Sequence, residues 1–410
     1  MNLRLESRDT ADLAGAHGEG ARWAMGLIVA LAEAFGAERL VDIDQAHLVG
    51  AYHSGPANLD LLDRLNSAGA RVRVPTTLSA SSADLSQTAP SCYADGHAAA
   101  ARAVVERALA LGCTPALTCA PYFLATAPRR GQVVAWAESN AAIFANSVIG
   151  AKSLKTPQYL DLACALTGRA PLIGPLIDAG RAPQLYVDIS ALSPAWFATS
   201  LGPELLGHVV GEVAGVLNPF ISRPPRPLDV LALRSVCAGA GVTSGFALLH
   251  IEGITPEADN WADTARSLPA ERLVDHDLHS LLSRFEVTEG DPVGAVFLGA
   301  PHFGPEDLNR LAALLNTPMK VPLLVSVSRG GTFESAILNR LDAAGVTLVH
   351  DTCTYYGPPA ENIAGVPVTN SVKWAAYATN RGFRPHLTSL VGAVEAARTG
   401  RVPAPIWITP

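Results

Sequence analysis

The last third of the chain alternates between short apolar runs and segments with helical spacing. Four apolar runs predict strands, at residues 295–298, 322–327, 346–350 and, less clearly, 366–369. Two segments between them predict helices, at residues 305–315 and 332–344, the second ending at Gly345. Strands and helices that alternate with short connections indicate a parallel α/β sheet.

The first part of the chain shows the same alternation in weaker form. Strands are expected at 45–49, 71–74 and 115–119, and helices at 59–69 and 132–149, the latter capped by Gly150. The apolar run at 23–35 is too short to span a membrane and predicts a buried helix. We expect an α/β protein with three approximate subdomains, at 1–130, 131–285 and 286–410.

Composition narrows the function classes. The 410 residues are 49% hydrophobic and 16% charged, with a net charge of -7, which is typical of a globular chain with a large core. The acidic balance predicts no nucleic-acid partner and no anionic membrane surface. The charged start at 1–9 does not resemble a secretory signal, so we expect a cytoplasmic protein. Six scattered cysteines then indicate thiols or metal ligands rather than disulfides.

Each predicted strand of the last third leads into a polar loop. These loops contain Ala300, Arg329, Asp351 and Lys373, and they should meet at one carboxyl edge, where open α/β sheets bind ligands. The segment 239–245 predicts a glycine-rich turn. Its spacing matches neither a dinucleotide fingerprint nor a P-loop, so neither NAD nor ATP is expected.

Several motifs are long enough to compare with known families. They are Thr118-Cys-Ala-Pro-Tyr122, Trp136-Ala-Glu-Ser-Asn-Ala141, Phe144-Ala-Asn-Ser-Val-Ile-Gly-Ala151, Leu249-His-Ile-Glu-Gly-Ile-Thr-Pro-Glu-Ala258, Leu298-Gly-Ala-Pro-His302, Asp351-Thr-Cys353 and Thr369-Asn-Ser-Val-Lys373. Together they resemble the large subunit of the aconitase X family. Tyr52-His-Ser-Gly55 and Val74-Pro-Thr-Thr-Leu78 fit the family's early motifs, and the resemblance runs from about residue 10 to 402.

The resemblance implies an aconitase-like fold, with several parallel-sheet subdomains around a central cleft, and hydro-lyase activity. Characterised members dehydrate cis-3-hydroxy-L-proline or mevalonate 5-phosphate. We favour a substrate like cis-3-hydroxy-L-proline, because no additional basic cluster for a phosphate stands near the motif loops. The alternatives are the large subunit of a mevalonate 5-phosphate dehydratase, a metal-free lyase or isomerase, or a non-catalytic homologue. RNA binding, known among aconitase relatives, is disfavoured by the acidic balance.

The resemblance also implies an iron–sulfur centre on three loops. Its cysteine ligands fall on Cys119, residue 300 and Cys353, but residue 300 is alanine, whose methyl group cannot bind iron. His302, Cys113 or Ser54 could supply a third ligand. A mixed-ligand iron centre, a dehydratase without metal and an inactive relic therefore all remain open.

Dehydration of a hydroxy acid needs a base, an acid and a group that stabilises the developing negative charge. Lys373 is the expected cation for the substrate carboxylate or the leaving hydroxyl, and Glu138 is a candidate base. His53 and Ser139 complete the catalytic candidates. Polar groups that could fix the substrate are Ser54, Gly55, Thr76, Thr77, Asn140, Asn146 and Ser371.

The family also has a small swivelling domain, either fused to the large part or on a separate subunit, which brings a catalytic serine. The large part accounts for the 410 residues, so we expect this domain on a partner chain and low activity without it.

Overall fold

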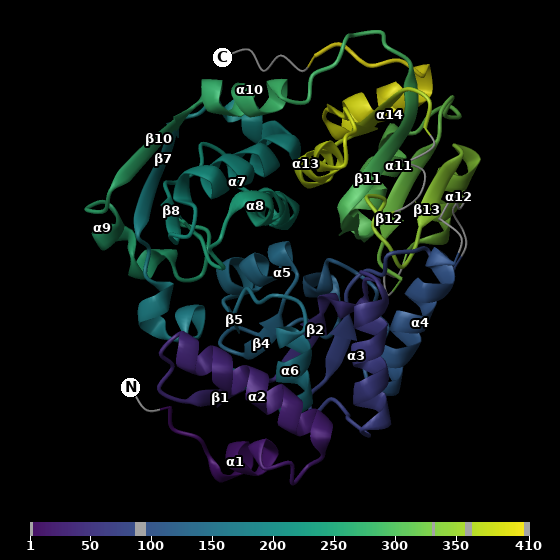
Figure 1. Ribbon diagram of the computed structural model, residues 1–410. Helices are drawn as coiled ribbons and strands as arrows, with labels where there is room; N and C mark the ends of the chain where they lie inside the picture. Colours follow the sequence, from purple (N-terminus) through teal and green to yellow (C-terminus); the bar gives the residue numbers. More distant parts are fainter. Residues whose placement is uncertain (1–2, 87–95, 330–332, 357–362, 406–410) are drawn as a thin grey trace.

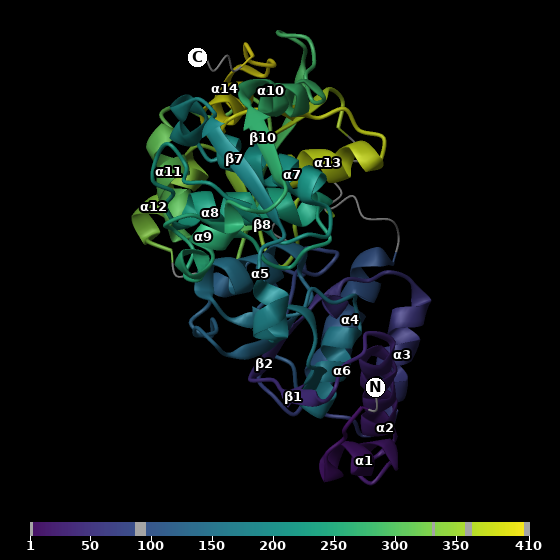
Figure 2. The ribbon, with the colours of Figure 1, turned by 90° about the vertical axis from the view of Figure 1, so that its left-hand side faces the viewer.

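Three parallel β-sheets organise the protein in a computed structural model that describes residues 3–86, 96–329, 333–356 and 363–405 (Figure 1). The N-terminal region forms the lower part of the molecule, and the middle and C-terminal regions lie side by side above it. Figure 2 shows the same arrangement from the side, with the N-terminal helices below the other two regions. No helix among the described residues has the length and apolar character needed to cross a membrane.

The N-terminal region contains a parallel sheet in the order β3-β2-β4-β5 and an antiparallel pair, β1-β6. Its strands are β1 (Leu40–Asp42), β2 (Gln45–Leu48), β3 (Thr76–Leu78), β4 (Val133–Trp136), β5 (Lys152–Ser153) and β6 (Arg169–Pro171). Its helices are α1 (Ser7–Leu13), α2 (Glu19–Ala34), α3 (Pro56–Ser67), α4 (His97–Ala110), α5 (Ser139–Phe144), a π-helical turn (Ala145–Ile149) and α6 (Leu160–Thr167). A boundary after residue 130 would divide this sheet, because β2 pairs with β4.

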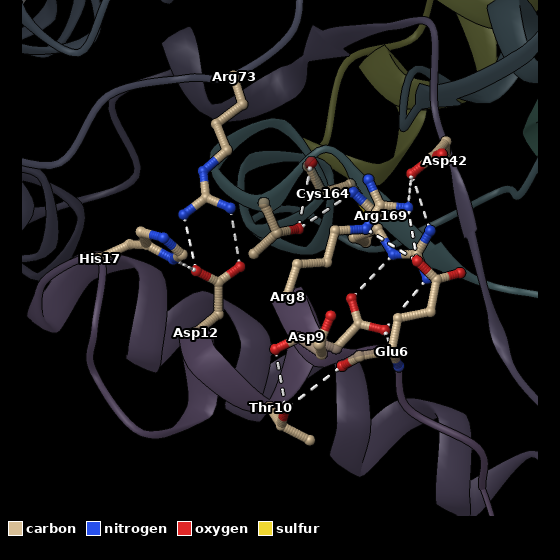
Figure 3. A network of polar contacts seen from close by, with 12 residues as sticks. Glu6, Arg8, Asp9, Thr10, Asp12, His17, Asp42, Arg73, Cys164 and Arg169 are labelled. Atoms are coloured by element: carbon tan, nitrogen blue, oxygen red, sulfur yellow. Dashed lines mark hydrogen bonds and ion pairs between the residues drawn. The ribbon is translucent and has the colours of Figure 1, made fainter.

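A polar network fastens the N-terminal helix to the rest of this region (Figure 3). The Arg169 guanidinium is 2% exposed and donates to Asp9 on α1 and to Asp42 at the end of β1. A second pair joins Asp12 to Arg73 at 2.7 Å. Asp9 is fully buried, so removing Arg169 would leave its carboxylate without a cation, which is strongly destabilising.

The middle region carries the sheet β10-β7-β8-β9 and two long helices. Its elements are β7 (Leu185–Ala191), α7 (Leu201–Ala214), β8 (Pro219–Ile221), α8 (Val230–Thr243), β9 (His250–Ile251), α9 (Ala262–Ala265), β10 (Ala270–Val274) and α10 (Asp275–Ser283). Helices α7 and α8 touch backbone to backbone. A Cβ on Gly207 would lie 2.0 Å from the Val236 oxygen, and one on Gly239 would lie 2.0 Å from the Glu204 oxygen. Glycine is therefore required on both sides of this seam.

The C-terminal region is a five-stranded sheet in the order β13-β12-β11-β14-β15. Its elements are β11 (Val293–Phe303), α11 (Pro305–Leu314), β12 (Leu323–Val327), α12 (Ser335–Ala343), β13 (Val346–Val349), β14 (Val366–Thr369), α13 (Val372–Asn380), β15 (His386–Leu387) and α14 (Leu390–Thr399). All its strand pairs are parallel, which confirms the predicted sheet. The strand interiors are apolar because helices cover both faces of the sheet.

Three local predictions were wrong. Residues 132–149 are not one helix, because the strand β4 precedes α5. Residues 71–74 and 115–119 form no strand; β3 begins only at Thr76. The predicted turn at 239–245 lies mostly inside α8, where its glycines serve helix contact rather than a ligand. The buried helix expected at 23–35 is present as α2.

Candidate active site

A bulge in β11 forms one wall of the site. Between its paired residues Leu298 and Phe303, β11 has four residues where β12 has one, Ser326. Gly299 adopts a φ of 86°, and a Cβ there would lie 2.3 Å from the Ser326 backbone oxygen, so only glycine fits. The bulge places Ala300 in the wall of a cavity.

A buried ion pair crosses from the N-terminal to the C-terminal region at this cavity. Lys373, in the first turn of α13, donates from Nζ to Glu138 Oε1 at 2.9 Å and to Asn140 Oδ1 at 3.1 Å. Burial alone would raise the pKa of Glu138, but the Lys373 ammonium outweighs it and holds this pKa below its usual value. Burial likewise opposes charge on Lys373, yet Glu138 raises the pKa of Lys373 well above its ordinary value. Both groups are therefore ionised at neutral pH.

Asn140 connects this pair to the Cys119 loop. Its Nδ2 donates to the Cys119 backbone oxygen at 3.1 Å and to the Tyr122 hydroxyl at 3.0 Å, while its Oδ1 accepts from Lys373. One fully hydrogen-bonded amide thus fixes both the ammonium and the loop that follows Thr118.

Glu204, on α7, binds the N-terminal end of α13 through hydrogen bonds. Its Oε1 accepts the Lys373 backbone N–H at 3.0 Å and the Ser371 hydroxyl at 2.9 Å. The Ser371 Oγ also lies against the Ala300 carbonyl oxygen and caps α13 by accepting the Trp374 N–H. Burial raises the pKa of Glu204 to about 7, even though its hydrogen bonds and Arg234 act in the opposite direction.

The cavity brings together five residues that the sequence marks, namely Cys119, Glu138, Ala300, Cys353 and Lys373. Its volume is about 40 Å³, which corresponds to room for about three water molecules.

The two thiols in this cavity are protonated. Burial raises the pKa of Cys119 to about 12, and the negative charge of Glu138 adds to the effect. Burial also raises the pKa of Cys353. The Cys119 Sγ accepts the His302 backbone N–H at 3.3 Å, and the five cysteines within the described ranges are all free.

These residues do not fit a cluster held by three thiolates. The third position carries the methyl group of Ala300, and no group of three or more His, Cys, Asp or Glu side chains in the described parts of the chain is placed to hold a metal ion. Of the substitutes that the sequence offers, Cys113 packs in the apolar core of the N-terminal region and Ser54 is exposed. His302 is 1% exposed, its two ring nitrogens have no hydrogen-bond partner among the described residues, and burial lowers its pKa to about 4.

The other predicted residues lie outside the cavity wall. His53 follows the lining residue Tyr52 but is not itself part of the wall; its ring packs edge-on against His97 at 5.8 Å. Gly55, with a φ of 120°, precedes α3, and Ser139 faces Gly241 on α8. The structure therefore does not bring His53, Ser54, Gly55 or Ser139 to the site.

Two threonines and one asparagine have structural bonds instead. Thr76 donates to the Val74 oxygen at 2.8 Å, and Thr77 Oγ1 lies 2.8 Å from His47 Nδ1. The Asn146 Nδ2 is within hydrogen-bond distance of three backbone oxygens, and its Oδ1 accepts from Ser153 and Arg181. With these bonds made, Asn146 has no group free for a substrate.

Sequence reasoning missed several residues of the site. Ser79 donates to Glu138 Oε2 at 3.2 Å, and Tyr52, Tyr356 and Tyr377 line the cavity. His47 is fully buried, and burial lowers its pKa to about 4, so its neutral ring holds the Thr118 carbonyl through Nε2. Two of these carried a usable signal, because Tyr52 begins the marked motif at 52–55 and Ser79 follows the marked motif at 74–78.

The fold and the site define a class of α/β enzyme with a charged pair at the junction of two parallel sheets. Comparison with known families identifies the class. Models of the aconitase X first, second and third domains match residues 2–179, 183–281 and 293–399. The chain belongs to the aconitase X family, as its motifs predict. The predicted boundary after residue 285 falls between the second and third matches, whereas that after 130 falls inside the first.

Similar proteins are named as dehydratases, that is, hydro-lyases. The chain is 36% identical to the cis-3-hydroxy-L-proline dehydratase of Pseudomonas aeruginosa, over 99% of this chain and 72% of that protein. It is 35% identical to that of Hypocrea jecorina, over 98% and 69%. It is 30% identical to the phosphomevalonate dehydratase large subunit of Thermococcus kodakarensis, over 96% and 100%.

A solved structure confirms the aconitase-like fold. The crystal structure of Thermococcus kodakaraensis aconitase X (holo-form) superposes with a TM-score of 0.85 at 27% identity, covering 96% of this chain and 100% of that one. The expectation of several parallel-sheet units is therefore confirmed at the level of the whole fold.

Proposed function

We propose that this chain is the large subunit of a hydro-lyase that removes water from a small β-hydroxy acid, with cis-3-hydroxy-L-proline as the favoured substrate. The observation that carries the proposal is the ionised pair Lys373–Glu138 in the cavity wall, fixed by Asn140. A cation beside a carboxylate meets two needs of the reaction, because one group can hold the substrate carboxylate and the other can take the proton next to it.

Substrate binding would make Glu138 a stronger base. A substrate carboxylate competes with Glu138 for the Lys373 ammonium, and that ammonium is what holds the pKa of Glu138 down. Once Lys373 turns to the substrate, burial dominates and the pKa of Glu138 rises. The carboxylate that receives the proton is therefore activated only when a substrate is present.

The charges of the cavity favour an amino acid over a phosphate ester. Among the described residues that line it, Lys373 is the one Lys or Arg, and Glu138 balances it. A zwitterion such as hydroxyproline matches this balance. A phosphorylated hydroxy acid brings several negative charges, for which the lining offers a single cation.

Stereochemistry calls for a second group. In a cis-3-hydroxy acid of a five-membered ring, the hydroxyl and the hydrogen on the α-carbon lie on opposite faces. Glu138 removes the α-proton from one face, so the hydroxyl must be protonated from the other as the C–O bond breaks. We assign this task to a partner subunit that covers the small cavity; the relatives named large subunits support such a partner.

No step of this scheme passes through an iron–sulfur cluster, because Cys119 and Cys353 do not make a three-thiolate site here. The two thiols remain protonated and bound the cavity beside the ion pair.

Turnover of three compounds tests the proposal. The purified chain, alone and mixed with a small aconitase X subunit, is given cis-3-hydroxy-L-proline, its trans isomer and mevalonate 5-phosphate, and loss of water is followed by proton NMR. We expect turnover of the cis isomer, and only in the mixture. Turnover of mevalonate 5-phosphate alone would establish the alternative substrate, and equal rates for the two proline isomers would overturn the assignment to opposite faces.

A further inference from the structure

A second pocket lies between the N-terminal and middle regions. It has a volume of about 410 Å³, within the usual range for small-molecule sites. Its walls are mainly apolar, with Leu31 of α2, Leu160 of α6, Ile173 and Phe246 among them. The pocket shares no lining residue with the cavity around Lys373.

One charged side chain, Lys155, lies in the described lining of this pocket. It stands two residues after the end of β5, at the carboxyl edge of the sheet whose β4 leads to Glu138. Its Nζ donates to the backbone oxygen of Ser244 at 2.5 Å, with the Ser244 hydroxyl at 3.4 Å. Both are neutral acceptors. In the described part of the chain, no carboxylate forms an ion pair with Lys155.

Lys155 is half-buried, and a charge withdrawn from water in this way is normally paired. Burial lowers the pKa of Lys155 to about 8, and the positive charge of Lys373 contributes in the same direction. The amine is therefore still charged at neutral pH but lacks a counter-ion. An anion in the pocket would supply one.

We infer that this pocket binds a small monocarboxylic acid, with its carboxylate on Lys155 and its hydrocarbon part against the apolar walls. The lone positive charge selects one anionic group, and the absence of acidic side chains from the described lining leaves that charge available. The walls select an apolar body over a bare inorganic ion. This inference does not depend on the proposed reaction.

Hexanoate is a suitable probe, with hexanamide as its neutral counterpart and inorganic phosphate as an anion without an apolar part. Binding is measured by calorimetry and by NMR of ¹³C-labelled lysine. The chain has four lysines, Lys152, Lys155, Lys320 and Lys373, so the four signals can be assigned by substitution. We expect hexanoate to bind with a Kd of about 1 mM and to shift the Lys155 signal and raise its pKa. Hexanamide and phosphate should bind at least about tenfold more weakly.

Lys155→Met should weaken hexanoate binding by about tenfold or more. The matched control is Lys152→Met, which removes a cation three residues earlier, in β5, that pairs with Asp178 at the surface. In the wild-type chain, affinity should fall about tenfold for each pH unit above the pKa of the free amine, because the neutral amine does not attract a carboxylate.

Three results would overturn the inference. They are equal binding of hexanoate and hexanamide, unchanged binding in Lys155→Met, and a shift of the Lys373 signal in place of the Lys155 signal. Failure of dehydratase activity would leave these measurements untouched, so the two proposals fail separately.

Discussion

Two lysines near sheet edges differ in their partners: the buried Lys373 lies beside a carboxylate, and the half-buried Lys155 lies beside neutral oxygens. Lys373 and Lys155 are both withdrawn from solvent, and burial acts against the charge of each. Glu138 lies 2.9 Å from Lys373 and raises its pKa, whereas the acceptors of Lys155 among the described residues are the neutral oxygens of Ser244, and its pKa is lowered to about 8. Burial therefore does not set the charge state by itself. The partner decides whether a buried cation stabilises the fold or strains it.

The largest effect is expected for Lys373→Met. It leaves the Glu138 carboxylate buried without a cation, so the unfolding free energy should fall by about 3–5 kcal/mol. Dehydratase activity with the partner subunit should fall by about 10³-fold. Urea unfolding and initial rates measure the two effects, with the exposed Lys320→Met as the control.

The double variant Lys373→Met with Glu138→Gln checks the cause. Neutralising both members should recover most of the lost stability, since no buried charge remains. A double variant as unstable as Lys373→Met alone would show that packing, rather than charge, explains the loss.

Glu204→Gln should have the next largest effect on the free energy of unfolding. It should raise this free energy, whereas Lys373→Met lowers it. Burial raises the pKa of Glu204 from its ordinary value of 4.5 to about 7, so between these values the folded state holds a proton that the unfolded state releases. The stability that Glu204 contributes therefore falls as pH rises through this window. Relative to wild type, the Gln variant should gain about 2–3 kcal/mol between about pH 5 and pH 8.

Urea unfolding at the two pH values measures this difference, and Glu212→Gln, on the same helix but partly exposed, is the control. A Gln variant whose stability parallels wild type at both pH values would contradict the raised pKa.

Lys155→Met should stabilise the protein by a smaller amount, about 1–2 kcal/mol at neutral pH, because a charge without a counter-ion is removed and its partial exposure reduces the gain. The pKa of Lys155 is lowered from 10.5 to about 8, so the folded state binds fewer protons than the unfolded state between these values. Wild-type stability therefore rises with pH over this window, and the advantage of Met should vanish near its upper end.

Thermal unfolding as a function of pH tests this, with Lys152→Met expected to change stability by less than about 0.5 kcal/mol. Destabilisation by Lys155→Met at neutral pH would contradict the claim that Lys155, unlike Lys373, lowers the stability of the fold.

The smallest effect on stability is expected for Ala300→Cys, because a single added sulfur atom faces the cavity. The unfolding free energy should change by less than about 1 kcal/mol. The substitution places a third thiol beside Cys119 and Cys353, so the variant should take up iron and sulfide on anaerobic reconstitution and become coloured. Visible absorption measures this; equal uptake by the wild-type chain would show that Ala300 is no obstacle.

The C-terminal sheet could be predicted from sequence because its strands are covered on both faces and therefore read as unbroken apolar runs. The sequence did not reveal that residues 132–149 contain a strand followed by a helix. The strand β4 spans only Val133–Trp136 and leads within three residues into α5, so the two periodicities merge. The glycines of α8 signal a turn in isolation, and only contact with α7 explains them.

The site shows the same division. Motifs that resemble a known family marked Cys119, Ala300, Cys353 and Lys373, and the fold brings them to one cavity. Glu204 and Lys155 stand in ordinary sequence surroundings, because their properties arise from burial by distant elements. Sequence could not separate Asn140, which holds Lys373, from Asn146, whose amide is used within the fold.

The glycine seam between α7 and α8 also limits how this chain can change by descent. Glu204, which holds the start of α13, is the residue whose backbone oxygen lies against Gly239. A new side chain at Gly207 or Gly239 would push the two helices apart and carry Glu204 away from Lys373. Substrate specificity can therefore evolve by substitution of the side chains that face the cavity, while these two glycines stay unchanged. At Gly207 and Gly239, any side chain larger than a hydrogen atom would collide with the backbone of the other helix.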